Sequence, residues 1–183
     1  MKKYQIIYAD PPWTGRYFTS TISIYPLMST DAIAALPIRS VAHPDAMLFL
    51  WTTMNAIPDA LRVIDAWGFH YVTNGFTWVK THAKSGKPVV GLGMWTRHNA
   101  EICLLAKRGR PARQSAAVRS LVIAPRRRHS QKPDVVRDRI VDLCGDVPRL
   151  ELFARQKTKG WDIWGNELPN DCNLLDHCGS QAA

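Results

Sequence analysis

Four consecutive residues near the N-terminus, Asp10-Pro11-Pro12-Trp13, combine groups that could do chemistry together. The two prolines fix φ and remove two backbone N–H groups, so this stretch of backbone offers only acceptors of hydrogen bonds. The Asp10 carboxylate adds another acceptor, and Trp13 adds a flat apolar surface. Such a rigid, acceptor-rich corner suits a planar ring that bears an exocyclic amine. The competing interpretation is a polar turn followed by a core tryptophan.

Three later segments carry groups that a nucleoside or a carboxylate would need. The pentapeptide Glu151-Leu152-Phe153-Ala154-Arg155 supplies an aromatic ring, a small residue that admits close backbone approach, and two charges. Lys132 precedes a predicted helix, whose N-terminus would favour the same anion as the ammonium. Gly165-Asn166-Glu167 offers an amide and a carboxylate suited to ribose hydroxyls. Taken singly, these segments are also typical of a strand end, a solvated lysine and a polar turn.

Apolar runs predict the strands that must position these residues. We expect strands at residues 4–9, 46–52, 69–80, 100–106, 121–124, 149–153 and 161–164. Helices are predicted from Ser29 or Thr30 to residue 36, from Asn55 to a stop at Gly68, and over residues 133–144. The strand–helix–strand order implies a right-handed parallel crossover. The corner at Asp10 would then lie at the carboxyl edge of a parallel sheet, where α/β proteins bind ligands.

Length and composition predict one ordinary globular domain. The 183 residues are 46% hydrophobic and 21% charged. We expect a single domain over residues 1–169 and a flexible tail over 170–183. No apolar run is long enough to cross a bilayer and none has the pattern of a signal peptide, so a cytoplasmic protein without a membrane partner is expected.

Cysteine and histidine usage favours neither disulfides nor a metal. The four cysteines form no paired framework, and Cys103 and Cys144 lie in apolar stretches typical of buried free thiols. His177 is close to two late cysteines, but without a second ligand pair a zinc site is not expected.

The charge distribution predicts an acidic polymer as partner. The formal net charge is +9 and the sequence pI is about 9.7. Between residues 107 and 139, basic side chains outnumber the two acids Asp134 and Asp138, which indicates a phosphate-facing surface rather than a mixed solvated face. The basic residues are Lys107, Arg108, Arg110, Arg113, Arg119, Arg126, Arg127, Arg128, Lys132, Arg137 and Arg139.

Together and in this order, the segments resemble the Asp-Pro-Pro-Trp family of adenine N6-methyltransferases. That family contains the catalytic subunit of the messenger-RNA adenosine methyltransferase, along with bacterial and phage relatives. The resemblance runs from about residue 6 to residue 168. It rests on Ala9 to Trp13, Tyr25, Met28-Ser29, Leu48 to Trp51, Trp78 to Thr81, Ser130, Lys132-Pro133, Glu151 to Phe153, Arg155 and Gly165-Asn166.

The resemblance implies an α/β fold of the Rossmann-like class I methyltransferases with permuted (beta-class) motif order, in which the catalytic corner precedes the cofactor-binding strand. S-adenosylmethionine would be the methyl donor. Lys132 would hold its carboxylate, and Phe153 with the backbone of Ala154, a position where many relatives have glycine, would line its nucleoside. The upstream adenine contact of larger relatives is expected to be lost or replaced. The implied cofactor residues are Lys132, Glu151, Phe153, Ala154, Arg155, Asn166 and Glu167.

The resemblance also implies how substrate would be held. Asp10, Pro11, Pro12 and Trp13 would form the catalytic corner: the Asp10 carboxylate and the Pro11 carbonyl would accept the two N6 hydrogens, and Trp13 would stack on the ring. The basic segment would bind phosphates, and two long polar loops, at residues 14–23 and 81–99, would read sequence. The expected substrate-binding residues are Tyr25, Trp95, Arg97, His98, Arg126, Arg127 and Arg128.

Several alternatives remain at this point. DNA is favoured over RNA because the chain is compact and carries no added RNA-binding domain, which is an argument by analogy. The bare motif also suits cytosine N4. A third interpretation is a non-catalytic nucleic-acid-binding subunit of a methyltransferase complex. A second copy of the chain or a related subunit is the partner that the family would suggest.

Overall fold

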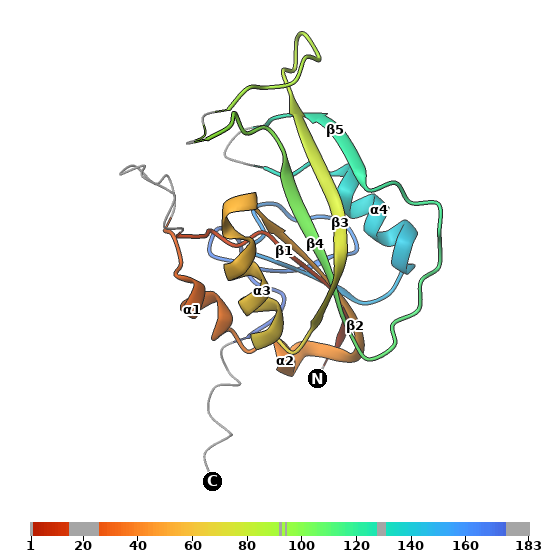
Figure 1. Ribbon diagram of the computed structural model, residues 1–183. Helices are drawn as coiled ribbons and strands as arrows, with labels where there is room; N and C mark the ends of the chain where they lie inside the picture. Colours follow the sequence, from red (N-terminus) through yellow and green to blue (C-terminus); the bar gives the residue numbers. More distant parts are fainter. Residues whose placement is uncertain (1, 15–25, 92, 94, 128–130, 175–183) are drawn as a thin grey trace.

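A computed structural model of the chain describes residues 2–14, 26–91, 93, 95–127 and 131–174 (Figure 1). Seven strands and four α-helices make up the described part. The strands are β1 (Tyr4–Ala9), β2 (Ala42–Thr52), β3 (His70–Thr81), β4 (Glu101–Arg108), β5 (Leu121–Pro125), β6 (Arg149–Leu152) and β7 (Asp162–Trp164). The helices are α1 (Thr30–Ala34), α2 (Ile38–Val41), α3 (Ile57–Ala66) and α4 (Val135–Cys144), and a 3₁₀ turn at Met54–Ala56 precedes α3.

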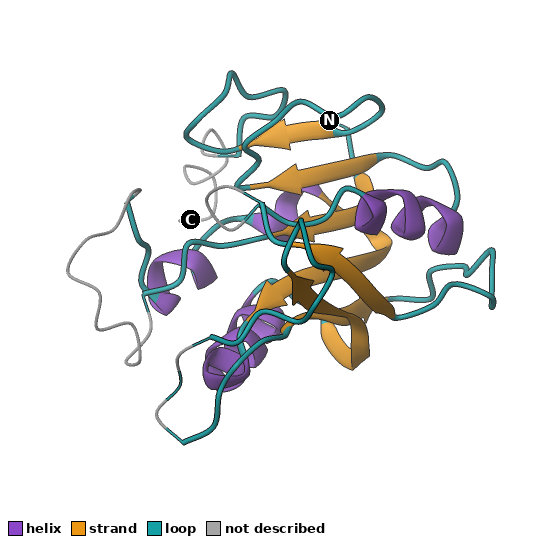
Figure 2. Cartoon of the chain, turned by 90° about the horizontal axis from the view of Figure 1, so that it is seen from above, coloured by secondary structure: helices purple, strands orange, loops and turns teal. Residues whose placement is uncertain are grey.

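The strands form one mixed sheet in the order β5-β3-β4-β2-β1-β6-β7. All pairs are parallel except those of β4, which runs antiparallel to both β2 and β3. Figure 2 shows the strands from above, with helices beside them. Because β2 and β3 are each antiparallel to β4, they are parallel to one another, as the strand–helix–strand order predicts, and β4 lies between them.

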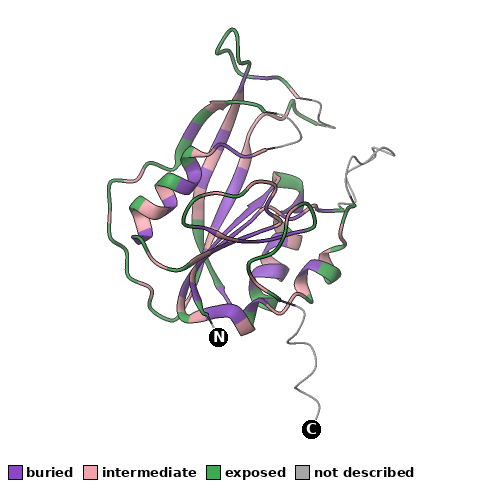
Figure 3. Ribbon diagram, turned by 180° about the vertical axis from the view of Figure 1, so that it is seen from behind, coloured by how far each residue is buried: buried purple, intermediate pink, exposed green. Residues whose placement is uncertain are grey.

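Each face of the sheet is covered by helices. On one face Ile7, Leu48 and Leu50 pack with α1 and α3; on the other, Ile6, Tyr8 and neighbouring strand residues pack with α4. Figure 3 shows the buried residues concentrated in the sheet between these helices. Covering on both faces explains why β1 and β2 are apolar at consecutive positions rather than alternating. Within the described residues, no helix is long and apolar enough to cross a bilayer.

Most element boundaries differ from the predicted ones by one or two residues, and three differences have a physical reason in the structure. Helix α2 follows Pro37, where only a helix stop was expected, and β2 starts at Ala42 because this residue pairs with Tyr4 across a register shift. Helix α4 starts at Val135, two residues after Pro133. Beyond the predicted domain boundary, Leu174 is fully buried against the core, so ordered packing continues at least to this residue.

The fold places a crevice between β1 and β6. These strands are neighbours, with Ala9 paired to Leu152, although they lie far apart in the chain. From β1 the chain passes to β2 on one side, and from β6 it passes to β7 on the other. Ligands of open α/β sheets bind at such switch points, outside the carboxyl ends of the strands. The strand that ends at Asp10 precedes its partner β6 in sequence, which is the permuted order that the resemblance implies.

Candidate active site

A cleft of about 750 Å³ opens at the carboxyl ends of β1 and β6. It gathers every residue predicted to hold the cofactor, together with two residues of the catalytic corner, Asp10 and Pro12. Sequence reasoning had brought these residues together from four separate segments. The lining residues are Tyr8, Asp10, Pro12, Pro26, Gln131, Lys132, Arg137, Glu151, Phe153, Ala154, Arg155, Gln156, Asn166 and Glu167.

Lys132 joins the corner to a second acid that sequence reasoning missed. Its Nζ lies 2.8 and 2.7 Å from the two carboxylate oxygens of Asp10 and 3.1 Å from Oε2 of Glu101. The ammonium is only 6% exposed, whereas the Asp10 side chain keeps 28% of its surface in contact with solvent. The corner carboxylate is therefore held by a buried cation and still reaches the cleft.

The pKa values follow from this arrangement. Burial raises the pKa of Asp10, and the nearby Glu101 raises it further against the pull of Lys132. Burial acts in the same direction on Glu101, but Lys132 and Lys80 outweigh it and hold the Glu101 pKa below its usual value. Burial would lower the pKa of Lys132, yet the two carboxylates more than offset this and raise it. The ammonium therefore stays charged.

Glu101 reaches the site because β4 is antiparallel. Glu101 is the first residue of β4, and it lies at the edge of the sheet where the parallel strands end, opposite Trp78 of β3. Lys80 of β3 forms an ion pair with Glu101, and the Asn99 side chain accepts a hydrogen bond from the Lys80 N–H at 2.9 Å. The signal in the sequence was an acid at the start of an apolar strand, which by itself is typical of a solvated strand end.

The four-residue corner is fixed by hydrogen bonds to its neighbours. The Pro11 carbonyl accepts the Trp13 N–H at 3.0 Å, and the Pro12 carbonyl accepts the Met28 N–H at 2.8 Å. Each carbonyl oxygen has a second lone pair available for a ligand. The corner is therefore preorganised before any substrate arrives.

Trp13 faces the core and not the cleft. Its ring is only 9% exposed and packs in the cluster beneath α1 and α3, and its Nε1 donates to the Trp51 carbonyl at 3.0 Å. This is the arrangement of the core-tryptophan alternative. In this position Trp13 does not line the cleft, and its expected stacking on a target ring stays a prediction.

An ion pair below the cleft explains the acid of the pentapeptide. Arg137 donates to both carboxylate oxygens of Glu151, at 2.7 and 2.5 Å, and both side chains are buried. Burial opposes the charge of Arg137, but this pair outweighs burial and raises the Arg137 pKa. The guanidinium also stacks over the Tyr8 ring, with its carbon 5.5 Å from the ring centroid. Glu151 thus lines the cleft with its charge already paired.

The end of β6 has an unusual backbone. Phe153 has φ 60, a conformation that bulky residues rarely adopt, and its ring packs edge-on against Trp164 with centroids 5.6 Å apart. Gly165 lies directly beside Ala154, where an added Cβ would come within 3.0 Å of the Ala154 backbone. Arg155 lies 3.5 Å from Glu167 across the cleft. Strained backbone of this kind clusters at ligand sites.

The structure gives the exposure of five of the seven residues expected to bind a polymer. Trp95 is 97% exposed, Arg97 and Arg126 are exposed, and His98 is half-buried. Arg127 is exposed and forms an ion pair with Asp134. Tyr25 and Arg128 lie outside the described residues.

Two members of the basic segment are not on the surface. Lys132 and Arg137 are buried in ion pairs, which contradicts the expectation that the whole segment faces phosphates. Arg139 donates to the carbonyls of Arg119 and Leu121 and so braces the neighbouring strand β5. Charge counts along the chain cannot distinguish a buried cation from a surface one. In the described part of the chain, no three metal-ligating side chains come together.

A parallel-dominated sheet with a nucleoside-sized cleft at its switch point, next to an acid-Pro-Pro corner, defines the Rossmann-like methyltransferases of permuted order. Comparison with known proteins narrows this class, because the MT-A70 family model matches residues 4–167. The chain belongs to the MT-A70 family of adenine N6-methyltransferases.

The relatives differ mainly in their own length. The type II methyltransferase M.MunI of Mycoplasma sp is 33% identical over 193 residues, which cover 93% of this chain and 80% of that protein. The N(6)-adenosine-methyltransferase catalytic subunit METTL3 of Homo sapiens is 30% identical over 178 residues, covering 95% of this chain and 30% of METTL3. A probable N(6)-adenosine-methyltransferase MT-A70-like protein of Oryza sativa is 29% identical, with 24% of its length covered.

Proposed function

We propose that this protein transfers the methyl group of S-adenosylmethionine to N6 of adenine in DNA. One observation carries the proposal: the Asp10 corner and the cofactor cleft share a buried lysine, Lys132. An acceptor for an amine and a cation for a carboxylate are thereby held side by side. A methyl donor that ends in a carboxylate and an acceptor that bears an exocyclic amine match these two groups.

The cleft fits the proposed donor in size and chemistry. Its volume lies within the roughly 300–1,000 Å³ typical of ligand sites. Lys132 would bind the carboxylate, the Phe153 ring with the Ala154 backbone would line the nucleoside, and Arg155 would lie at the ribose. Asn166 and Glu167 would offer polar groups to the same ribose. When bound, S-adenosylmethionine supplies a methyl group that is already activated by the positively charged sulfur.

The corner would supply orientation rather than strong base catalysis. The Asp10 carboxylate and the second lone pair of the Pro11 carbonyl would accept the two N6 hydrogens. This geometry draws the nitrogen lone pair out of conjugation with the ring and directs it toward the cleft. Positioning and electrostatics of this kind supply most of the rate when the methyl group is already activated. The proton leaves after attack, when the ammonium is strongly acidic.

Lys132 would also control when Asp10 is available. Both Asp10 oxygens are now engaged by the ammonium. A ligand carboxylate on Lys132 would take over part of that pairing and leave Asp10 freer to accept from an amine. Glu101, which stays paired to Lys132 and Lys80, would keep the lysine charged and in place.

DNA is the polymer we propose. The type II methyltransferase M.MunI is 33% identical to this chain, whereas the N(6)-adenosine-methyltransferase relatives are 28–30% identical. Positive charge on the exposed loops would attract either polymer. The target base must leave the helix of a duplex, and an exposed aromatic such as Trp95 would assist. We place the reaction, and with it the protein, in the cytoplasm.

The test is transfer of a tritiated methyl group to unmethylated DNA and RNA, followed by analysis of the nucleosides. We expect label in N6-methyldeoxyadenosine. Asp10→Ala should lower the transfer rate by about 10²–10³-fold, the usual effect of removing one preorganised polar group from an active site. Asp10→Asn, which keeps an acceptor but not the charge, should lose less. Label in RNA or in cytosine would refute the proposed substrate, and near wild-type transfer by Asp10→Ala would refute the role of the corner.

A further inference from the structure

A second hollow lies at the far end of β3, outside the cleft described above. It is open, about 650 Å³ in volume, and has a basic lining. Its walls come from the turn after β3 and from the end of β5, which pairs in parallel with β3. The lining residues are His82, Ala83, Lys84, Ser85, Lys87, Pro88 and Arg126.

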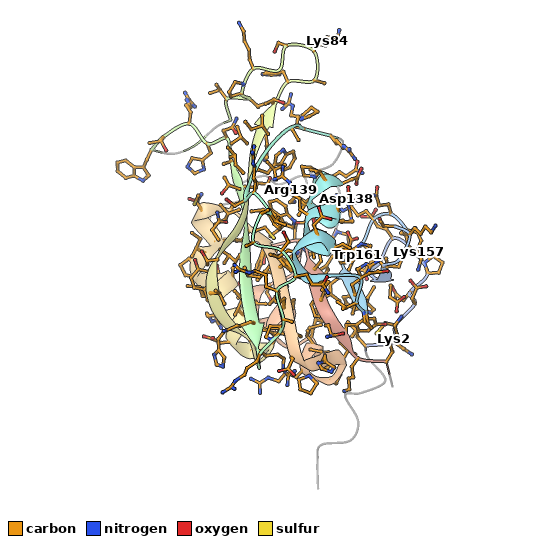
Figure 4. The ribbon with its side chains drawn as sticks, turned by 90° about the vertical axis from the view of Figure 1, so that its right-hand side faces the viewer. Lys2, Lys84, Asp138, Arg139, Lys157 and Trp161 are labelled. Atoms are coloured by element: carbon orange, nitrogen blue, oxygen red, sulfur yellow. The ribbon has the colours of Figure 1, made fainter. Side chains whose placement is uncertain are left out.

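The hollow and the cleft open at the same edge of the sheet. Strands β1, β3 and β5 all run in one direction, so Asp10, Thr81 and Pro125 mark the same side. Figure 4 shows Lys84 at one end of the molecule and Lys2, which precedes β1, toward the other. A ligand that reaches from the cleft along this edge would therefore meet the hollow.

Backbone hydrogen bonds fix the shape of the hollow. The His82 N–H donates to the Lys87 carbonyl at 2.9 Å, and the Gly86 N–H donates to the His82 carbonyl at 2.9 Å. Gly86 has φ 66, which closes the turn. Arg126 is tied to the same strand end because its N–H donates to the Thr81 carbonyl at 3.1 Å. The cations are thus held on a defined turn.

No acid balances these cations. Lys84, Lys87 and Arg126 form no ion pair with any residue that the structure describes, and no carboxylate lines the hollow. The neighbouring Lys80, in contrast, turns inward to Glu101. Three like charges around one hollow favour occupation by an anion.

We propose that this hollow binds a backbone phosphate of the nucleic acid, several nucleotides away from the adenine in the cleft. The proposal rests on the function proposed above. Strands β3 and β1 are separated by β4 and β2, which places them about 14 Å apart at the usual strand spacing. The register places Asp10 level with Phe76, and the hollow begins past Thr81, five residues or about 17 Å further along β3. The two sites are therefore about 22 Å apart, which corresponds to about six nucleotide steps of stacked DNA. The hollow would contribute affinity and register but no base specificity.

The first experiment measures how binding depends on salt. The variant Lys84→Ala/Lys87→Ala is compared with Lys2→Ala/Lys159→Ala, which removes two exposed lysines from other parts of the surface. Loss of this one phosphate contact should reduce the slope of log K against log salt by about 0.9 on duplex DNA or about 0.7 on a single strand. The control should leave the slope unchanged. An unchanged slope in the test variant, with methyl transfer intact, would overturn the proposal.

A second experiment locates the phosphate. Neutral methylphosphonates are placed one at a time along a methylated oligonucleotide. Substitution about six nucleotides from the adenine should weaken binding to the wild-type protein and have no further effect on Lys84→Ala/Lys87→Ala. Equal weakening of both proteins at every position would overturn the assignment.

A third measurement separates this proposal from its parent. Binding of inorganic phosphate to the protein, measured by competition with the oligonucleotide, tests whether a free anion alone fills the hollow. If phosphate binds tightly but the lysine substitutions do not change DNA binding, the nucleic-acid assignment is overturned. If the salt slope falls as expected but no methyl group is transferred to adenine, the hollow stands and the proposed function fails.

Discussion

The cleft at Asp10 and the hollow at the end of β3 differ in whether their charged side chains are paired. At the cleft, Lys132 pairs with Asp10 and with Glu101, Lys80 pairs with Glu101 as the second cation, and Arg137 pairs with Glu151. At the end of β3, the cations Lys84 and Lys87 face solvent on a tight turn without acidic partners in the described chain. Paired and buried charges hold geometry, whereas exposed and unbalanced charges attract a polyanion in a way that salt weakens.

This contrast predicts where substitutions will act. A change in the cleft should disturb folding and chemistry together, because each charge there has a partner that would be left buried and unpaired. A change on the exposed loops should leave folding intact and alter polymer binding alone. The four predictions below test this separation, beginning with the largest effect.

Lys132→Met should have the largest effect. It leaves the carboxylates of Asp10 and Glu101 without their shared cation, so the free energy of unfolding should fall by about 3–5 kcal/mol. Binding of S-adenosylmethionine, followed by calorimetry, should be lost as well. Lys80→Met is the matched control, because Lys80 is more exposed and Glu101 would keep Lys132. A urea midpoint of Lys132→Met equal to that of the wild type would contradict the structural role of Lys132.

Arg137→Met should come next. This substitution leaves the buried Glu151 carboxylate without its cation, so the free energy of unfolding, measured by urea unfolding, should fall by about 3 kcal/mol. The double variant Arg137→Met/Glu151→Met should recover much of the loss, because no unpaired charge remains. If the double variant is as unstable as the single one, the pair acts through packing and not through charge.

Trp95→Ala should affect binding but not folding. The ring is 97% exposed, so the melting temperature should stay the same. Affinity for a single-stranded oligonucleotide should fall by about 1–3 kcal/mol, the usual value of one aromatic stacking contact. Trp95→Phe should retain part of the affinity. A drop in melting temperature with unchanged affinity would show that the loop is structural.

Glu101→Gln should destabilise the protein least of the three cleft variants, and its difference from the wild type should be greatest near neutral pH and fade in acid. The Glu101 pKa is lowered below 4.5 by Lys132 and Lys80 against the effect of burial, so its stabilising contribution is complete above pH 4.5 and is lost as pH falls through the folded value. The variant should therefore lose stability less steeply than the wild type at low pH. Urea midpoints between about pH 3 and pH 7 measure the difference. Identical acid limbs would show that the pair with Lys132 does not stabilise the fold.

The local part of the fold was predictable from the sequence. All seven strands were predicted, and β1 and β2 were the clearest, because strands covered on both faces need apolar residues at consecutive positions. The corner at Asp10 and the pentapeptide ending at Arg155 came to one cleft because both follow strands that point the same way. What links β1 to β6 as neighbours is the permuted topology, which only the family resemblance supplied.

Other features depended on contacts between distant residues. Glu101 enters the site because one strand runs backwards, and nothing in its local sequence reveals direction. Trp13 was expected at the substrate because of its place in the motif. In the structure its Nε1 donates to the Trp51 carbonyl and its ring packs in the core beneath α1. Arg137 belongs to a basic run in the sequence but turns to Glu151 in the fold. Burial of a charge becomes visible only once its partner is known.

The base of the β3–β4 connection has a consequence for how such proteins diversify. Lys80 pairs with Glu101 at its two ends, and Asn99 bonds both the N–H and the carbonyl of Lys80, at 2.9 and 3.0 Å. These contacts close the intervening segment at its base, so its length and residues can change while the contacts of Lys80, Asn99 and Glu101 stay the same. Lengthening a closed loop costs little, about 0.6 kcal/mol per doubling. Under the proposed function, exchanging this segment between homologues should change how the polymer is bound and leave the Asp10 corner unchanged.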